Sequence, residues 1–224
     1  MRILLFGATG MVGQGVLREC LLDRDVELIV TIGRSATGIR DTKLREIVRE
    51  ELSTFSDIAS DLSGFDACFF CLGVSSSGMS EKEYERVTYG ITLAAAGVLS
   101  RLNPQMTFVY ISGAGTDSSE RGRVMWARVK GRTENALQQL PFHAVYLLRP
   151  GVILPIHGER SKVRTYRIFY ALAGPVLRFA RRLAPDRFLT TEIIGKAMLA
   201  LARYGGSKPV LEAKDIYLTA NQHP

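Results

Sequence analysis

A chain of 224 residues, with 46% hydrophobic and 23% charged residues, fits one globular domain and leaves little room for a second. No apolar run approaches the roughly 18 residues of a membrane-spanning helix, so we expect a soluble protein. The short apolar run before Gly7 is too short for a secretory signal peptide, which predicts a cytoplasmic location.

The formal net charge of +7 is concentrated in one segment. Eight basic residues and one acid, Asp186, lie between Arg160 and Arg187, so this segment carries the entire excess. No nucleic-acid-binding module is recognisable, and a specific nucleic-acid partner is not expected. The favoured interpretation is an amphipathic helical pattern with a solvated basic face, whose apolar side closes a cleft. Binding to an acidic substrate, an anionic membrane surface or an acidic partner is the alternative.

Apolar, β-rich runs alternate with amphipathic stretches along the chain. Clear strands are expected at Arg2–Phe6, Glu27–Ile32, Asp66–Leu72, Thr107–Ile111 and Ala144–Leu148, and a weaker one near Ile47–Leu52. Helices are expected at 81–102, after the capping box of Ser80 and Glu83, at 124–140 and at 192–204. This alternation predicts an α/β fold with a mostly parallel sheet.

We expect a single domain over residues 1–224, made of a core at 1–153, a basic cap segment at 154–190, and a C-terminal helix and strand at 191–224. Cys68 and Cys71 have the spacing of a redox or zinc pair, but residues three apart in a strand face opposite sides, which favours buried packing. The three histidines are scattered, so no metal site is expected.

A glycine-rich loop, Gly7-Ala8-Thr9-Gly10-Met11-Val12-Gly13, joins the first strand to a helical pattern. In a dinucleotide site, the first glycine permits the tight turn and the second lets the backbone approach the pyrophosphate. The third lets the helix lie close to the sheet. The position between strand and helix is the context that the motif requires.

The second strand runs into Gly33-Arg34-Ser35, without the acid that an NAD-specific site places there for the ribose hydroxyl. Arg34 can instead form a charge-assisted contact with the 2′-phosphate of NADP, with Ser35 adding a hydroxyl. The sequence therefore favours NADP, with NAD as the alternative.

Further motifs follow the later strands: Cys71-Leu72-Gly73, Ser112, Lys130 and Arg149-Pro150-Gly151. Together with the glycine loop and Gly33-Arg34, they cover about residues 1–153 and resemble the atypical, epimerase-like branch of the short-chain dehydrogenase/reductase superfamily. The resemblance implies a Rossmann-type, doubly wound sheet with a small C-terminal cap. It also implies that Leu72-Gly73-Val74 line the cofactor and that Pro150-Gly151-Val152 passes near the nicotinamide.

The same resemblance implies that Ser112 orients a substrate carbonyl and that Lys130 holds the nicotinamide ribose. The family pairs this lysine with a catalytic tyrosine four residues earlier, where this chain has Trp126, and the family's asparagine in the preceding helix corresponds to Thr88. An indole N–H is not a usable acid near neutral pH. Tyr166 and Tyr170 are candidate replacements, although packing is the favoured interpretation for both.

Three functions remain open. The favoured one is an NADP(H)-dependent oxidoreductase that acts on a small carbonyl, quinone or flavin; a flavin or quinone can take its proton from solvent. The alternatives are a non-catalytic NADP(H)-binding sensor and an epimerase or isomerase. Only about 70 residues follow Val152, which favours a small substrate. The sequence leaves open a monomer or a homodimer.

Overall fold

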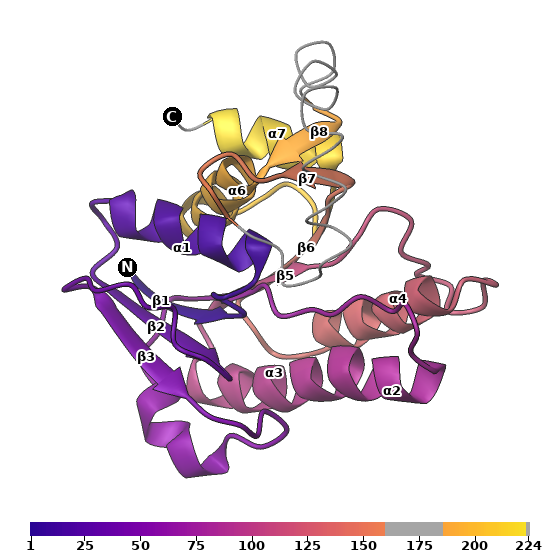
Figure 1. Cartoon of the computed structure of the whole chain (residues 1–224), viewed down its shortest axis with the longest axis horizontal. Helices are drawn as coiled ribbons and strands as arrows, with labels where there is room; N and C mark the ends of the chain where they lie inside the picture. The colour runs from indigo at the N-terminus through magenta and orange to yellow at the C-terminus, as the bar shows by residue number, and fades with distance from the viewer. Residues whose placement is uncertain (160–185, 223–224) are drawn as a thin grey trace.

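The central sheet has seven parallel strands within residues 1–159 and 186–222, the part of the chain that the computed structural model describes. Its order is β3-β2-β1-β4-β5-β6-β9 (Figure 1). The strands are β1 (Arg2–Phe6), β2 (Leu28–Gly33), β3 (Leu44–Val48), β4 (Ala67–Phe70), β5 (Thr107–Ile111), β6 (Ala144–Arg149) and β9 (Val210–Glu212). The predicted α/β fold with a Rossmann-type sheet is therefore confirmed.

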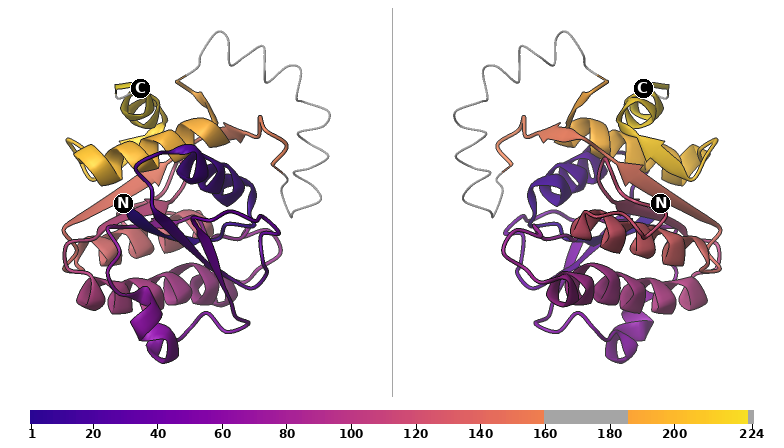
Figure 2. Two further views of the ribbon diagram at one scale, coloured as in Figure 1. Left: turned by 90° about the vertical axis from the view of Figure 1, so that its left-hand side faces the viewer. Right: turned by 90° about the vertical axis from the view of Figure 1, so that its right-hand side faces the viewer.

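Helices cover both faces of this sheet, as Figures 1 and 2 show. One face carries α1 (Met11–Leu22), α6 (Thr191–Tyr204) and α7 (Ala213–Gln222). The other carries α2 (Glu81–Glu85), α3 (Ile91–Leu102) and α4 (Met125–Gln138). The structure also has a short 3-10 helix, η1 (Ser56–Leu62), and a second sheet made of β7 (Val152–Leu154) and β8 (Phe188–Thr190).

Alternating side chains of the strands fill two separate cores. Along β1, Ile3 and Leu5 face the core shared with α1 and α6, whereas Leu4 and Phe6 face the core shared with α3. On the α3 side the aromatic rings stack across the strands, with Phe6 and Phe70 ring centroids 5.0 Å apart. A sheet buried on both faces explains why the strands read as nearly continuous apolar runs.

The five clear strands are confirmed with small shifts at their ends. The weaker strand lies at Leu44–Val48 rather than Ile47–Leu52, because it is an edge strand whose register is set by pairing with β2. The Arg49 N–H extends this pairing by donating to the Gly33 carbonyl at 3.0 Å.

The expected helix at 81–102 contains an irregular turn. Its capping box is confirmed, because the Ser80 hydroxyl accepts from the Glu83 N–H while the Glu83 carboxylate accepts from the Ser80 N–H. A π-helical turn, η2 (Arg86–Gly90), then separates α2 from α3. Such turns often mark functional sites.

The buried-packing interpretation of the cysteines is confirmed. All three thiols are free, Cys68 lies in the α3-side core, and Cys71 packs against the opposite one. The described residues contain no cluster of side chains suited to a metal ion, and none of their helices is both long and apolar enough to span a membrane. Most of the basic cap segment, including Tyr166 and Tyr170, lies outside the described residues; Asp186 and Arg187 lie just before β8.

Candidate functional site

The glycine-rich loop connects β1 to α1 in a geometry that requires glycine at two positions. Gly7 has a φ of 80°, and a Cβ there would lie 2.6 Å from the backbone nitrogen of Leu72. A Cβ on Gly13 would lie 2.1 Å from the Gly7 carbonyl oxygen. The Gly10 N–H donates to the Gly7 carbonyl at 2.9 Å and closes the turn. Helix α1 therefore begins directly against the end of β1.

The first turn of α1 is open to an anion. Gly10 is the N-cap and provides no side-chain cap, and no acidic residue lies in the first turn. Met11 and Val12 are half-buried, and the first N–H groups of a helix have no partner within the helix. A helix start of this kind suits a phosphate.

The loop lies where the strand order reverses. Strands β2 and β3 lie on one side of β1, and β4, β5, β6 and β9 lie on the other. Ligands of open parallel sheets bind at such a switch point. Leu72 follows β4 and meets the glycine turn, whereas Gly73 and Val74 are exposed at the same edge. The structure therefore brings Leu72-Gly73-Val74 beside the glycine loop.

A cavity of about 660 Å³ opens next to this loop. Its walls come from the glycine loop, α1, the loop after β2 and the segment after β7. The lining residues are Ala8, Thr9, Gln14, Arg18, Ser35, Ala36, Thr37, Ile39, His157, Gly158 and Glu159. The contributions of α1 and of 157–159 were not found from the sequence. The spacing of Gln14 and Arg18, four residues apart, was the available signal for α1, since it places both on one side of the helix.

The loop after β2 holds the two residues expected to select the cofactor. Ser35 lines the cavity, whereas Arg34 is exposed and is not part of the cavity wall. Glu46 on β3 fixes this loop: its carboxylate accepts from the Thr37 N–H at 2.7 Å and from the Thr31 hydroxyl at 3.3 Å. Sequence reasoning missed this acid, whose carboxylate is engaged in holding the loop.

The loop after β5 carries Ser112 beside the end of β6. The Ser112 N–H donates to the Leu148 carbonyl at 2.7 Å, and the Ala114 N–H donates to the Pro150 carbonyl at 2.9 Å. The structure thus brings Ser112 and Pro150 together; Gly151 and Val152, at the start of β7, are exposed.

The hydroxyl of Ser112 is already engaged. It lies 3.0 Å from the Thr116 hydroxyl, which donates its own hydrogen to the Gly113 carbonyl at 2.8 Å. Ser112 is therefore the donor to Thr116. In this arrangement the Ser112 hydrogen is not offered to a substrate carbonyl, and such a role requires the hydroxyl to rotate.

Trp126 and Lys130 lie one turn apart on α4. The indole of Trp126 covers the loop after Ser112, with ring atoms 3.6 and 3.8 Å from the positions that a Cβ would take on Gly113 and Gly115. Lys130 is buried, and its Nζ donates to the Tyr110 hydroxyl at 2.9 Å and to the Ile111 carbonyl at 3.0 Å. Burial lowers the pKa of Lys130 to about 8, partly opposed by the charge of Glu134.

Thr88 lies in the π-helical turn, and its carbonyl accepts from the Thr92 hydroxyl at 2.5 Å. The Thr88 hydroxyl is buried, and among the described residues it makes no hydrogen bond of good geometry. Burial raises the pKa of the neighbouring Tyr84, and an interaction with the Thr88 side chain opposes this rise in part. Tyr110 is fully buried beside Lys130.

Comparison with other proteins gives relatives in fungi, whereas no protein-family model matches the chain. FMP52-2 of Scheffersomyces stipitis, a protein named as mitochondrial, is 31% identical over 164 residues, which cover 72% of this chain and 69% of that protein. This chain belongs to the FMP52 family. Fmp52 of Emericella nidulans is 27% identical over 225 residues, covering 96% of this chain and 94% of the relative.

The FMP52 relatives contradict the expected cytoplasmic location, because they are named as mitochondrial proteins. The expectation depended on the lack of a secretory apolar segment. That test detects export through a membrane and does not address delivery to a mitochondrion.

Solved structures confirm that this FMP52-family chain has the short-chain dehydrogenase/reductase fold. An oxidoreductase of that family from Burkholderia thailandensis has a TM-score of 0.69 at 13% identity and covers 99% of this chain and 94% of its own. WbmF of Bordetella bronchiseptica, solved in complex with NAD+, has a TM-score of 0.67 at 14% identity, covering 99% and 77%. UDP-glucose 4-epimerase of Thermotoga maritima has a TM-score of 0.68 at 12% identity, covering 99% and 82%. At these identities the likeness shows the fold alone.

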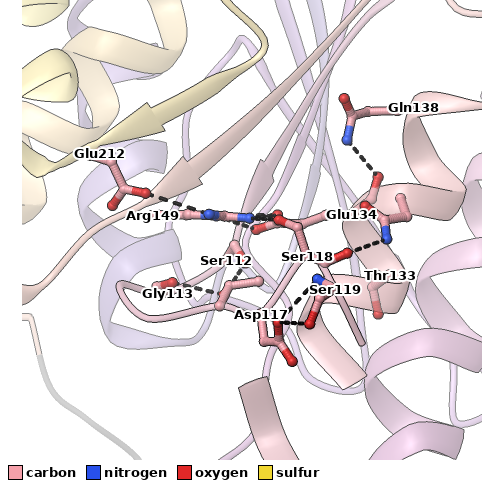
Figure 3. A network of polar contacts seen from close by, with 12 residues as sticks. Ser112, Gly113, Asp117, Ser118, Ser119, Thr133, Glu134, Gln138, Arg149 and Glu212 are labelled. Atoms are coloured by element: carbon pink, nitrogen blue, oxygen red, sulfur yellow. Dashed lines mark hydrogen bonds and ion pairs between the residues drawn. The ribbon is translucent and has the colours of Figure 1, made fainter. Parts of the chain in front are cut away.

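In this FMP52-family chain a buried ionic network supports the loop of Ser112 (Figure 3). The Nε of Arg149 donates to both oxygens of Glu134, at 3.1 and 3.2 Å, and its Nη2 donates to the Ser118 hydroxyl at 2.6 Å. Glu212 lies 3.5 Å from Nη1. The hydrogen bonds to Glu134 raise the pKa of Arg149. The network joins α4, β6, β9 and the loop after β5, so Arg149 holds in place the loop that carries Ser112.

Proposed function

We propose that this chain is an NADP(H)-dependent oxidoreductase of the atypical short-chain dehydrogenase/reductase type that acts on a small carbonyl, quinone or flavin. The observation that carries the proposal is the close approach of α1 to β1, where Gly7 and Gly13 have no room for a side chain. This approach directs the open start of α1 at the switch point of the sheet. In this proposal the loop from Gly7 to Gly13 holds the pyrophosphate, and Leu72-Gly73-Val74 and Pro150-Gly151-Val152 border the cofactor.

The preference for NADP depends on the charge after β2. Arg34 is exposed at the carboxyl end of β2, and Ser35 faces the adjoining cavity. The carboxylate of Glu46, on the neighbouring strand β3, is bound to Thr31 and Thr37. A phosphate at this position is therefore favoured over a bare ribose hydroxyl.

Titration with NADPH and NADH tests the site and the cofactor choice together. Trp126 is the sole tryptophan, and its fluorescence is expected to be quenched as nucleotide binds. We expect Arg34→Ala to weaken NADPH binding about tenfold, because it removes a charge-assisted hydrogen bond, and to leave NADH binding unchanged.

Arg24→Ala is the matched control, because Arg24 is also exposed but precedes β2, whereas Arg34 follows it. The strand separates the two positions by about 20 Å. Binding of neither nucleotide to the wild type would overturn the proposed function.

In the proposed reaction, Lys130 holds the nicotinamide ribose, and Ser112 orients the substrate after its hydroxyl has rotated away from Thr116. NADP(H), when bound, supplies or accepts the hydride. Trp126 occupies the position from which the family's tyrosine delivers a proton, and an indole cannot do so near neutral pH. A flavin or quinone acceptor fits this arrangement best, since its reduction can take a proton from solvent.

Trp126→Tyr is expected to raise NADPH-dependent reduction of small carbonyl compounds at least about tenfold, because it restores an acid one turn before Lys130. The measurement is the loss of NADPH absorbance with a panel of aldehydes and ketones. Trp126→Phe is the control, since it removes the indole without adding a hydroxyl. Equal rates for the two variants would show that the missing acid does not limit carbonyl reduction.

A non-catalytic NADP(H)-binding protein is the second candidate. Two observations favour it: the indole of Trp126 covers the Gly113–Gly115 loop, and the Ser112 hydroxyl is committed to Thr116. Tight NADPH binding together with no turnover of any carbonyl, quinone or flavin acceptor would support this candidate over the oxidoreductase.

A further inference from the structure

The cavity beside the glycine loop extends from the start of α1 to the loop after β2. Ala8 and Thr9 of the glycine loop line it together with Ser35, Thr37 and Ile39 of the loop after β2. Its volume of about 660 Å³ lies within the range of small-molecule sites, about 300–1,000 Å³. If the pyrophosphate binds at the start of α1, this cavity faces the adenosine half of the dinucleotide.

The fixed charge in the segment after β7 is negative. Glu159 lines the cavity, and its carboxylate accepts from the Thr191 hydroxyl and from the His157 N–H, both at 2.8 Å. Burial opposes ionisation, but these hydrogen bonds lower the pKa of Glu159, so the group stays charged at neutral pH. A phosphate in this cavity therefore requires a cation that offsets this charge.

Arg18 is the only lysine or arginine among the described residues that line this cavity. It lies one turn after Gln14 on α1, and side chains of a helix lean toward its start, so Arg18 leans toward the glycine loop. Nη1 pairs with Glu19, whereas Nε and Nη2 make no hydrogen bond to the described residues. The Arg18 side chain is 40% exposed and that of Glu19 only 7%, so the free side of the guanidinium is the accessible part of the pair.

We propose that Arg18 binds the 2′-phosphate of NADP(H) inside the cavity, as a second cationic contact in addition to the exposed Arg34. The inference rests on the proposed function and names the group that selects the cofactor. A guanidinium with two free donor positions can bind phosphate oxygens in a forked geometry, which a lysine cannot reproduce. Ser35 and Thr37, from the loop after β2, add polar side chains to the lining of the same cavity.

Calorimetric titration with 2′,5′-ADP and 5′-AMP isolates the 2′-phosphate, because the two ligands share the adenosine and the 5′-phosphate. Wild type is expected to prefer 2′,5′-ADP at least about tenfold, and Arg18→Gln to lose about tenfold of that preference while its affinity for 5′-AMP and NADH stays within about twofold. The glutamine can still donate to Glu19, so the buried carboxylate keeps a partner.

Two further variants complete the test. Arg18→Lys retains the charge and is expected to keep part of the preference for 2′,5′-ADP. Arg24→Gln removes a charge before β2 and is expected to bind both ligands with wild-type affinity. A full preference for 2′,5′-ADP in Arg18→Gln, or equal binding of the two ligands by the wild type, would overturn the role of Arg18 and leave the dinucleotide site standing. Failure of wild type to bind any nucleotide, NADH included, would overturn the proposed function and the role of Arg18 with it.

Discussion

Replacing Gly13 with alanine is expected to lower NADPH affinity at least about a hundredfold, the equivalent of one or two charge-assisted hydrogen bonds. The added Cβ would lie 2.1 Å from the Gly7 carbonyl oxygen and 2.7 Å from the Gly7 carbonyl carbon. Both are backbone atoms, so α1 must move away from the loop. The N–H groups at the start of α1 then no longer point at the pyrophosphate. The measurement is calorimetric titration with NADPH.

Gly97→Ala is the control for this variant. Gly97 lies inside α3, and no atom lies within 4 Å of the position that its Cβ would take. We expect unchanged NADPH binding and a gain of about 0.5–1 kcal/mol in stability from alanine's higher helix propensity. Wild-type NADPH affinity in Gly13→Ala would contradict the close packing of α1 as the basis of the site.

The central sheet could be predicted because its strands have two buried faces. Continuous apolar runs such as Arg2–Phe6 and Thr107–Ile111 coincide with β1 and β5 residue for residue. The C-terminal strand expected within 191–224 is β9, a three-residue strand added to β6. The strands that were missed, β7 and β8, have three residues each and pair with one another across more than 30 residues of chain. Their stability comes from tertiary pairing, so local pattern gave little signal.

The candidate site divides in the same way. The turn from Gly7 to Gly13 is local, and the sequence therefore predicted its position and the close packing at Gly7 and Gly13. Gly10 was expected for the ligand, and a Cβ there would lie 3.3 Å from the Gly7 carbonyl oxygen. Other features depend on residues far apart in the chain. Arg18 and the 157–159 segment line the same cavity, and Ser112 gives its hydrogen to Thr116 only because of how their loop folds.

The sequence located the motif that contains Arg149 but did not predict the contacts of the Arg149 side chain. Arg149 was noted as part of Arg149-Pro150-Gly151, and only the structure shows that its side chain turns away from Pro150 to bind Glu134 and Ser118. A family resemblance can locate such a residue, but the hydrogen-bond partners of its side chain follow only from the three-dimensional structure.

Arg149→Met is expected to destabilise the protein by about 3–5 kcal/mol, because it leaves the carboxylate of Glu134 buried without its cation. The Glu134 side chain is only 1% exposed, and that of Arg149 is 12% exposed. Urea unfolding measures the loss. Because the network joins α4 to the loop after β5, the same variant is expected to loosen the packing of Trp126, which a red shift of its emission would report.

Two companion variants separate a buried pair from a surface contact. Glu212→Gln removes the partner that is 54% exposed and lies 3.5 Å from Arg149, so its expected cost is at most about 1 kcal/mol. The double variant Arg149→Met with Glu134→Leu removes both charges and is expected to recover most of the lost stability, since an apolar pair can replace a buried ion pair at little net cost. If Arg149→Met costs no more than Glu212→Gln, the network is only a surface contact, and the support of the Ser112 loop has to come from the close packing of Gly131 against Asp117, where a Cβ would lie 1.8 Å from the Asp117 carbonyl oxygen.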